Sequence, residues 1–189
     1  MKTNANPTII NGIDTDAVRQ LVGGVAADAA RGATRWQVVS HWQGGTRSDA
    51  HVSQYMIGGQ TVPKDFVIRV DEPLELGGTN RYANPQETLL AALNACMIAH
   101  YAIAAAMHGV ELEALSIETE GDIDLRGFLG LDPDVKAGYD SLRYTVRMAG
   151  NGTPEQMEAI HANVTALSPN RFNIANAIRL DGRLVVEQS

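Results

Sequence analysis

The amino-acid sequence predicts a single domain of mixed structure, in which helices pack with antiparallel strands. Three observations carry this prediction. Residues 84–109 form a long apolar helix with a marked start and stop, residues 35–70 read as short strands separated by turns, and residues 153–169 carry an amphipathic helix. With 189 residues, the chain is long enough to bury most of the surface that its unfolded form would expose.

The N-terminal residues 1–13 are polar and follow no period, so we expect a loose arm there. A helix is predicted from Asp14 to Arg31, where apolar residues recur at helical spacing, although two consecutive glycines weaken it in the middle. The period then changes to that of an antiparallel meander, with strands expected over residues 35–42, 51–56 and 65–70 and a turn over residues 44–49.

The central helix has the clearest boundaries. Asn84 is a good N-cap, Pro85 suits the first helical position, and Glu87 completes a capping box with Asn84. Gly109 supplies the stop. Because only two polar residues interrupt the apolar run from 89 to 107, we expect this helix to be buried nearly all round, by other elements or by another subunit.

A run of this length also suggests a membrane span, which needs about 20 apolar residues. Much of the run is alanine, however, and Gln86 and Glu87 precede it instead of basic anchors. No second candidate span accompanies it. We therefore interpret it as the central helix of a soluble protein.

The second half of the chain continues with strands, a helix and a hairpin. Strands are predicted over residues 115–125 and 142–148, and the long loop between them suggests a functional segment or one packed over another element. Thr153 caps the amphipathic helix, which runs to Ser168. The Asp-Gly pair at 181–182 predicts a terminal hairpin. We expect residues 1–34 to form an extension and residues 35–189 the main domain.

Composition excludes several classes of function. The net charge of −7 argues against a nucleic-acid partner and against an anionic membrane surface. One cysteine cannot form an internal disulfide, and the first twenty residues lack the pattern of a signal peptide, so we expect a cytoplasmic protein. The sequence carries neither a phosphate-binding glycine loop nor a hydrolase elbow, and no cofactor is expected.

Cys96 is the one soft nucleophile in the chain, and it lies in the middle of the central helix on one stripe with His100. It is either a small core hydrophobe or a redox thiol. In the second case a cation from another segment must keep it ionised, because the helix dipole acts only within the first turn. A metal site built from Cys96, His100 and His108 is not expected, since their spacing matches no common metal motif.

Four segments resemble the OsmC family, which includes the organic hydroperoxide resistance proteins. They are WQGGTR at 42–47, GGTNRYANPQETLLAALNAC at 77–96, GDIDLRGFLGL at 121–131, and the Ser-Pro pair at 168–169. The resemblance covers roughly residues 35–186 in the same order. It implies an α+β fold, an intertwined homodimer in which antiparallel sheets wrap two long central helices, with active sites at the subunit interface.

The resemblance also implies the reduction of hydroperoxides by a cysteine thiolate, which leaves a sulfenic acid that a second cysteine and a dithiol then resolve. Cys96 matches the reactive cysteine and Arg47 the arginine that holds the thiolate. In the family a glutamate near the start of the central helix holds the arginine. That position is Gln86 here, with Glu87 beside it. Ser168 stands where the second cysteine would be.

These departures weaken the expected site in specific ways. Gln86 brings no charge to Arg47, and ten residues of helix place it about 15 Å from Cys96. Glu87 is out of phase with Cys96 on the helix. With Ser168 in place of a cysteine, a sulfenic acid on Cys96 needs an external thiol reductant. The sequence therefore leaves open whether the protein is an enzyme.

Two hypotheses follow. In the first, the protein is a one-cysteine hydroperoxide reductase that uses Cys96 and Arg47. In the second, it is a non-catalytic dimer of the same fold, whose interface pocket binds a small apolar ligand against Cys96, Met97, His100 and Phe128. A purely structural dimer is a third alternative.

Overall fold

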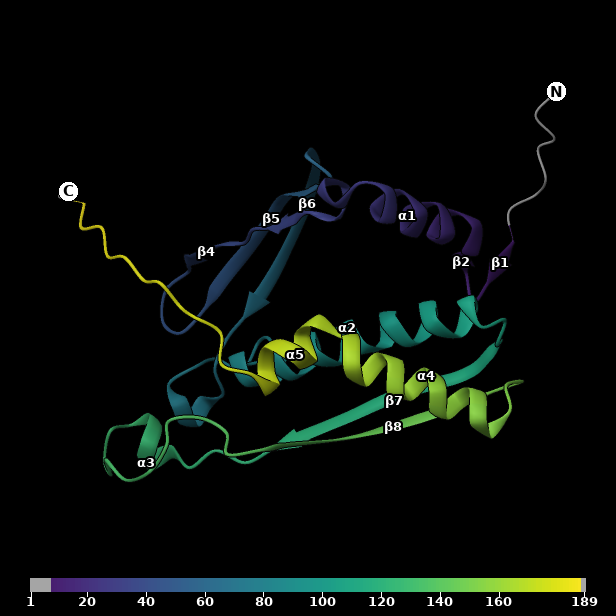
Figure 1. Cartoon of the computed structure of the whole chain (residues 1–189). Coiled ribbons are helices and arrows are strands. Elements are labelled where there is room, and N and C mark those ends of the chain that lie inside the picture. Colours follow the sequence, from purple (N-terminus) through teal and green to yellow (C-terminus); the bar gives the residue numbers. More distant parts are fainter. Residues whose placement is uncertain (1–7, 188–189) are drawn as a thin grey trace.

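The computed structural model describes residues 8–187, and its longest helix is α2, Pro85–Met107 (Figure 1). The antiparallel pair β7, Leu112–Gly121, and β8, Leu142–Gly150, lies along one side of α2. Two helices, α4, Pro154–Leu167, and α5, Pro169–Ala175, contact it as well. The chain thus has the α+β architecture with antiparallel sheets that the sequence predicted.

Both ends of α2 are built as the sequence predicted. The side chain of Asn84 accepts a hydrogen bond from the backbone N–H of Glu87, and the Glu87 carboxylate accepts one from the N–H of Asn84. Gly109 ends the helix with a φ of 71°, a backbone conformation that favours glycine over other residues. These local contacts fix where the helix starts and stops.

The core lies where α2, α4 and the β7–β8 pair meet. Alternate residues of both strands turn towards the helices while the others face solvent. Most of the fully buried side chains at the centre come from α2 and α4, among them Met97, Tyr101, Ala105, Ile160 and Val164. This core holds the middle of α2 in a fixed position.

A second sheet stands apart from this core (Figure 1). Its central strand β5, Ser48–Ile57, pairs on one side with β6, Gln60–Val70, and on the other with the end-to-end strands β3, Thr34–Trp36, and β4, Val39–Trp42. The sequence predicted this meander but began β6 five residues too late, because the Gly58-Gly59 turn with two positive φ angles was overlooked. Large apolar side chains remain exposed on the sheet, among them Trp36, Trp42, Phe66 and Ile68.

The N-terminal extension is more ordered than expected. Residues 8–13, predicted as part of a loose arm, include strand β1, Ile9–Ile10, and the start of β2, Ile13–Asp14. The rest of the expected arm, residues 1–7, lies outside the described residues. The Asn11 side chain donates to the carbonyl of Val110 and accepts from the N–H of Leu112, so it ties the extension to the start of β7.

Two helical pieces follow these strands. Helix α1 runs over Thr15–Ala27, and a 3-10 turn, η1, follows at Ala29–Gly32. The predicted helix of residues 14–31 is therefore split, because Asp28 caps η1 through its own side chain instead of continuing α1.

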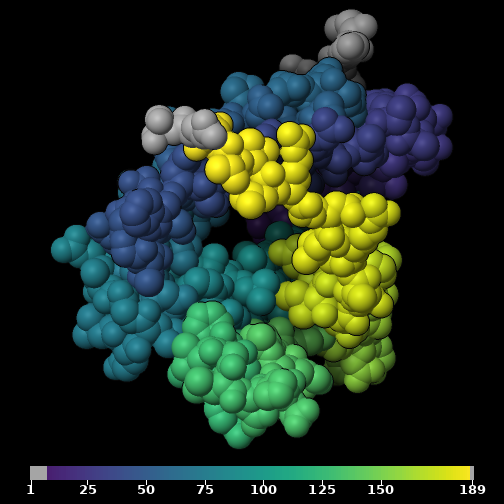
Figure 2. Space-filling view, turned by 90° about the vertical axis from the view of Figure 1, so that its left-hand side faces the viewer, coloured from purple at the N-terminus to yellow at the C-terminus, as the bar shows by residue number. Residues whose placement is uncertain are grey.

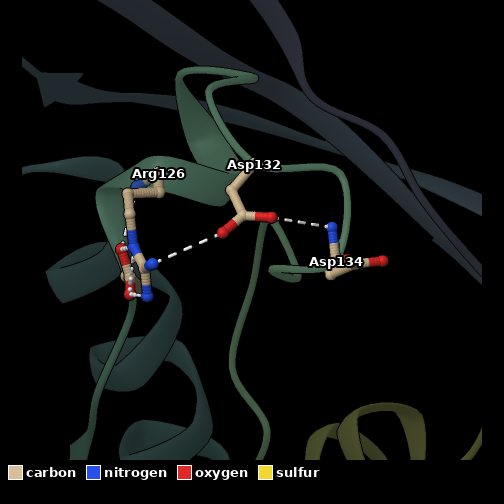
Figure 3. Close-up of polar contacts among 4 residues, drawn as sticks. Arg126, Asp132 and Asp134 are labelled. Carbon is tan, nitrogen blue, oxygen red and sulfur yellow. Dashed lines mark hydrogen bonds and ion pairs between the residues drawn. The ribbon is translucent and has the colours of Figure 1, made fainter.

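The loop between β7 and β8 contains a short helix, α3, Leu125–Phe128, and is held by charged side chains (Figure 3). Arg126 pairs with Asp124 at 2.6 Å and with Asp132 at 3.3 Å, and Asp132 also accepts from the N–H of Asp134. A Cβ at Gly127 would stand 2.1 Å from the carbonyl oxygen of Lys136, so the loop can close here only on a glycine. Strand β7 ends at Gly121, earlier than the predicted residue 125, and the residues that follow belong to this loop.

The C-terminal segment does not form the predicted hairpin. Residues 176–187 form neither a helix nor a strand and pair with no strand in the described chain. The Asp-Gly pair favours a turn, but the flanking residues find no neighbouring strand to hydrogen-bond, and Leu180 and Leu184 are more than four-fifths exposed.

Within one chain helix α2 is buried on one side only, so the elements of its own chain supply part of the cover that the sequence predicted; cover of the other side by another subunit stays a prediction. The opposite face carries Ala91, Ala95, Ile98, Ala99 and Ile103, with Ile98 at 37% and Ile103 at 39% exposure. Figure 2 shows a hollow in the molecule, bordered by the blue sheet strands, the green loop around α3 and the yellow C-terminal helices. By length and composition α2 is the one helix of the described residues able to cross a membrane, which is weak evidence because core helices pass the same test.

Candidate functional site

Cys96 and Ser168 meet at the centre of the fold. Cys96 lies half-buried in the middle of α2, and its Sγ is 3.5 Å from the Oγ of Ser168, a residue 72 positions later in the chain. Ser168 is 1% exposed and forms the junction between α4 and α5. The structure therefore brings together the two positions that the resemblance to OsmC proteins paired.

The backbone around Ser168 leaves its side chain little freedom. Its N–H donates to the carbonyl of Val164 and its carbonyl accepts from the N–H of Phe172, so it belongs to both helices. Pro169 starts α5, and the Asn170 side chain donates to the carbonyl of Ala92 on α2 at 2.9 Å. This last bond fixes the α4–α5 junction against α2 one turn before Cys96.

The contact allows one kind of chemistry and excludes another. A serine hydroxyl can donate a hydrogen bond to a thiolate, and a charged acceptor makes such a bond stronger. Serine cannot form a disulfide. The structure therefore places a hydroxyl group beside the thiol of Cys96, and this pair cannot form a disulfide.

Arg47 lies on the other sheet, in the turn between β4 and β5. Its guanidinium donates to the carbonyl of Gln43 at 2.9 Å, and the turn is shaped by Gly44 and Gly45, both with positive φ. Among the described residues no hydrogen bond or ion pair joins Arg47 to Cys96. Within one chain, the guanidinium of Arg47 and the thiol of Cys96 therefore do not interact directly.

Gln86 and Glu87 are exposed in the first turn of α2. Glu87 is engaged in the capping box with Asn84, which explains its presence without a catalytic role. Its carboxylate stabilises the helix start, and the helix places both residues far along its axis from Cys96.

The three residues expected to line an apolar pocket lie in different surroundings. Met97 is fully buried in the core, His100 is half-buried on α2, and Phe128 is 59% exposed on α3. None of them lines the cavity between β8 and α4 or the cavity between α2, β8 and α5.

Asp71 is a site residue that sequence analysis missed. It follows β6 and is fully buried, and its carboxylate accepts from the hydroxyls of Thr79 and Thr46 and from the backbone N–H groups of Glu72, Thr79 and Arg81. The hydrogen bond from Thr79 is the largest cause that holds the pKa of Asp71 well below its ordinary value, against the opposing effect of burial. Asp71 thereby ties the turn that carries Arg47 to the loop that leads into α2.

Tyr101 and His161 form a second polar pair that the sequence did not indicate. The hydroxyl of the fully buried Tyr101 hydrogen-bonds Nδ1 of His161 on α4. Burial raises the pKa of Tyr101 to about 12, with a further contribution from Tyr144. The pair lines a cavity of about 560 Å³ between β8 and α4, which Val146, Met148 and Met157 complete with apolar walls.

No group of three or more His, Cys, Asp or Glu side chains within residues 8–187 is placed to hold a metal ion.

The chain is similar to proteins of one family. The model of the family described as OsmC-like protein matches residues 78–181, more than half of the chain. No curated protein sequence matches it.

Solved structures agree on the fold. An OsmC-like protein from Mycoplasma pneumoniae superposes with a TM-score of 0.59 at 14% identity, over 75% of this chain and 87% of that one. A candidate osmotic stress induced and detoxification response protein from Psychrobacter arcticus superposes with a TM-score of 0.55 at 12% identity, over 71% of this chain and 85% of that one. An OsmC-like protein of unknown function from Vibrio cholerae superposes with a TM-score of 0.51 at 15% identity, over 73% of this chain and 92% of that one. At these identities the likeness concerns the fold alone.

Proposed function

The chain belongs to the OsmC family, and from this premise we propose that it is a thiol-dependent hydroperoxide reductase with Cys96 as its single reactive cysteine. The family includes organic hydroperoxide resistance proteins, which supports a peroxide-related role. The observation that carries the proposal to this chain is the contact between Cys96 and Ser168, since it places a hydroxyl where a resolving thiol would have to stand.

The reaction proceeds in three steps that need only an external thiol. The Cys96 thiolate attacks the distal peroxide oxygen, the O–O bond breaks, and the alkoxide takes up a proton and leaves as the alcohol. A first external thiol then attacks the sulfenic sulfur, which releases water and forms a mixed disulfide. A second external thiol attacks this disulfide, which returns the Cys96 thiol and releases the oxidised reductant.

Ser168 supports the first step as a hydrogen-bond donor. Its side chain is buried and its Oγ faces Cys96, so its hydroxyl proton is directed at the thiolate when Cys96 ionises. Hydrogen bonds to charged acceptors contribute about 1.5 to 3 kcal/mol, so such a bond from Ser168 holds the sulfur in place while it attacks the peroxide. Ser168 thus takes a positioning role in place of the second cysteine.

The cation that the mechanism needs comes, in this proposal, from a second copy of the chain. In one chain Arg47 lies on the separate sheet, while the exposed apolar face of α2 runs beside Cys96. A homodimer that packs these α2 faces together buries the apolar residues and places the sheet of one copy near the thiol of the other. Arg47 of the second copy is then the group that holds the Cys96 thiolate.

Peroxide consumption tests the function directly. The purified full chain, supplied with a small dithiol and an organic hydroperoxide, is expected to consume peroxide, whereas Cys96→Ser is expected to show only the background rate. His100→Ala is the matched control, because it removes a polar residue one turn away on the same helix and leaves the thiol intact. Activity that survives in Cys96→Ser would refute the proposal.

The alternative, a non-catalytic dimer that binds a small apolar ligand against Met97, His100 and Phe128, has less support. Met97 is enclosed in the core of its own chain, and Phe128 belongs to the loop around α3. An inactive wild-type protein that binds apolar compounds at Cys96 would favour this alternative.

A further inference from the structure

A cavity of about 510 Å³ lies between the first half of α2, the start of β8 and α5. Its walls are mainly apolar and include Leu89, Leu93, Leu142 and Ile174. Volumes of about 300 to 1,000 Å³ are typical of sites for small organic molecules. The cavity is separate from the one beside His161, with which it shares only Tyr144.

Arg171 forms the polar end of this cavity, and its bonding is unusual for an arginine. Nε donates to the hydroxyl of Tyr144 at 3.2 Å and Nη1 donates to the carbonyl of Thr165 at 2.8 Å, so both partners are neutral. No ion pair joins Arg171 to a carboxylate among the described residues, although the side chain is half-buried. A guanidinium partly removed from water without a counter-charge favours the binding of an anion.

Tyr144 adds a second donor beside the guanidinium. Its oxygen accepts from Arg171, which leaves its own O–H free to donate into the cavity. Asp140 also lines the cavity, but it is 78% exposed and pairs with Lys136, so its charge lies at the mouth and is partly compensated. One cation and one hydroxyl suit a single carboxylate better than a phosphate, which needs more donors.

We infer that this cavity binds a small organic carboxylate with an apolar body, its carboxylate on Arg171 and Tyr144 and its body against the leucines and Ile174. The site is distinct from the thiol chemistry, since neither Cys96 nor Ser168 lines it. It is nevertheless close to that chemistry, because Leu93 and Arg171 each lie three residues from a member of the Cys96–Ser168 pair.

Decanoate, used below the concentration at which it forms micelles, is the probe, and calorimetric titration of the full chain is the measurement. The wild type is expected to bind decanoate saturably, and the neutral decanol at least about tenfold more weakly. Arg171→Gln is expected to weaken decanoate binding by at least about tenfold. Arg147→Gln, a change to an exposed arginine on the same strand as Tyr144, is the control and leaves the affinity unchanged.

Three results overturn the inference: no saturable binding, equal affinity for decanoate and decanol, or unchanged affinity in a folded Arg171→Gln. If Arg171→Gln does not fold, decanoate binding is measured with Ile174→Trp instead. Its larger side chain fills the cavity from α5, so this variant is expected to lose decanoate binding, and unchanged affinity would overturn the inference. The titration is repeated with Cys96→Ser, which leaves the cavity lining intact. Binding that persists there without peroxide activity separates this site from the proposed function.

Discussion

The Sγ of Cys96 lies 3.5 Å from the Oγ of Ser168, although 72 residues separate them in the chain. A contact this close between two side chains held by different helices makes Ser168 a candidate position for a resolving cysteine. We predict that Ser168→Cys forms a disulfide with Cys96 on mild oxidation, because sulfur atoms bond at about 2.05 Å and only a small adjustment is needed.

The disulfide is measured by titration of free thiols and by mass spectrometry of the oxidised variant. Ser141→Cys serves as the control, because it introduces a second cysteine at an exposed position of the chain. If the oxidised Ser168→Cys variant still has two free thiols, the side chains at positions 96 and 168 do not lie as close together as the structure places them. With a dithiol present, the disulfide-forming variant is expected to turn over peroxide faster than the wild type.

Arg47 is expected to favour the ionised form of Cys96 across the dimer interface. Arg47→Ala should therefore slow alkylation of Cys96 by iodoacetamide at neutral pH by about tenfold, because a neighbouring positive charge stabilises a thiolate. Arg35→Ala, a change on strand β3 at the other end of β5, controls for the loss of a positive charge on the same sheet. Equal alkylation rates for the wild type and the Arg47 variant would remove Arg47 from the mechanism.

The exposed apolar face of α2 predicts a dimer. Ile98→Asp places a charge in the centre of that face, and burying an unpaired carboxylate costs several kcal/mol, so the variant is expected to be monomeric at micromolar concentration. Light scattering after size exclusion measures the mass. Asn163→Asp adds the same charge to the exposed side of α4 and should leave the dimer intact. A monomeric wild type would contradict the account.

The lowered pKa of Asp71 predicts that the free energy of unfolding falls at acidic pH. Its pKa is lowered in the folded state, chiefly by the Thr79 hydroxyl, so its contribution is fully present above the unfolded pKa of about 3.9 and is lost as the pH falls towards the lower folded value. Asp71→Ala should therefore reduce the urea midpoint at neutral pH, and the difference from the wild type should narrow below about pH 3. An equal difference at both pH values would exclude a special role for this carboxylate.

The parts of the fold that sequence analysis predicted are those whose signals are local. The capping boxes of Asn84 with Glu87 and of Thr153 with Gln156 are each complete within four residues, and both helices start where expected. The predicted terminal hairpin was wrong. The Asp-Gly pair signals a turn locally, but the strands on either side of it are stable only when a further strand or helix packs against them. The apolar composition of α2 predicted a fully covered helix, but it did not say which side its own chain covers, because composition does not distinguish a core from a docking face.

The candidate site was only partly predictable for the same reason. The link between Cys96 and Ser168 came from family resemblance, since no physical rule connects two residues so far apart in sequence. Asp71 escaped notice because its partners are loop hydroxyls and backbone N–H groups, which leave no pattern in the sequence. Arg171 was missed because its neutral partners become visible only once α5 is placed against β8.

The central claim is that Cys96 itself carries the oxidised intermediate and that an external thiol resolves it. The most direct measurement is intact-mass spectrometry of the reduced full chain after one equivalent of an organic hydroperoxide, with and without a thiol trap. We predict the gain of one oxygen atom on Cys96, which becomes a mixed disulfide when a monothiol is added and disappears with a dithiol. An unchanged mass at Cys96 while the peroxide is consumed would contradict the account.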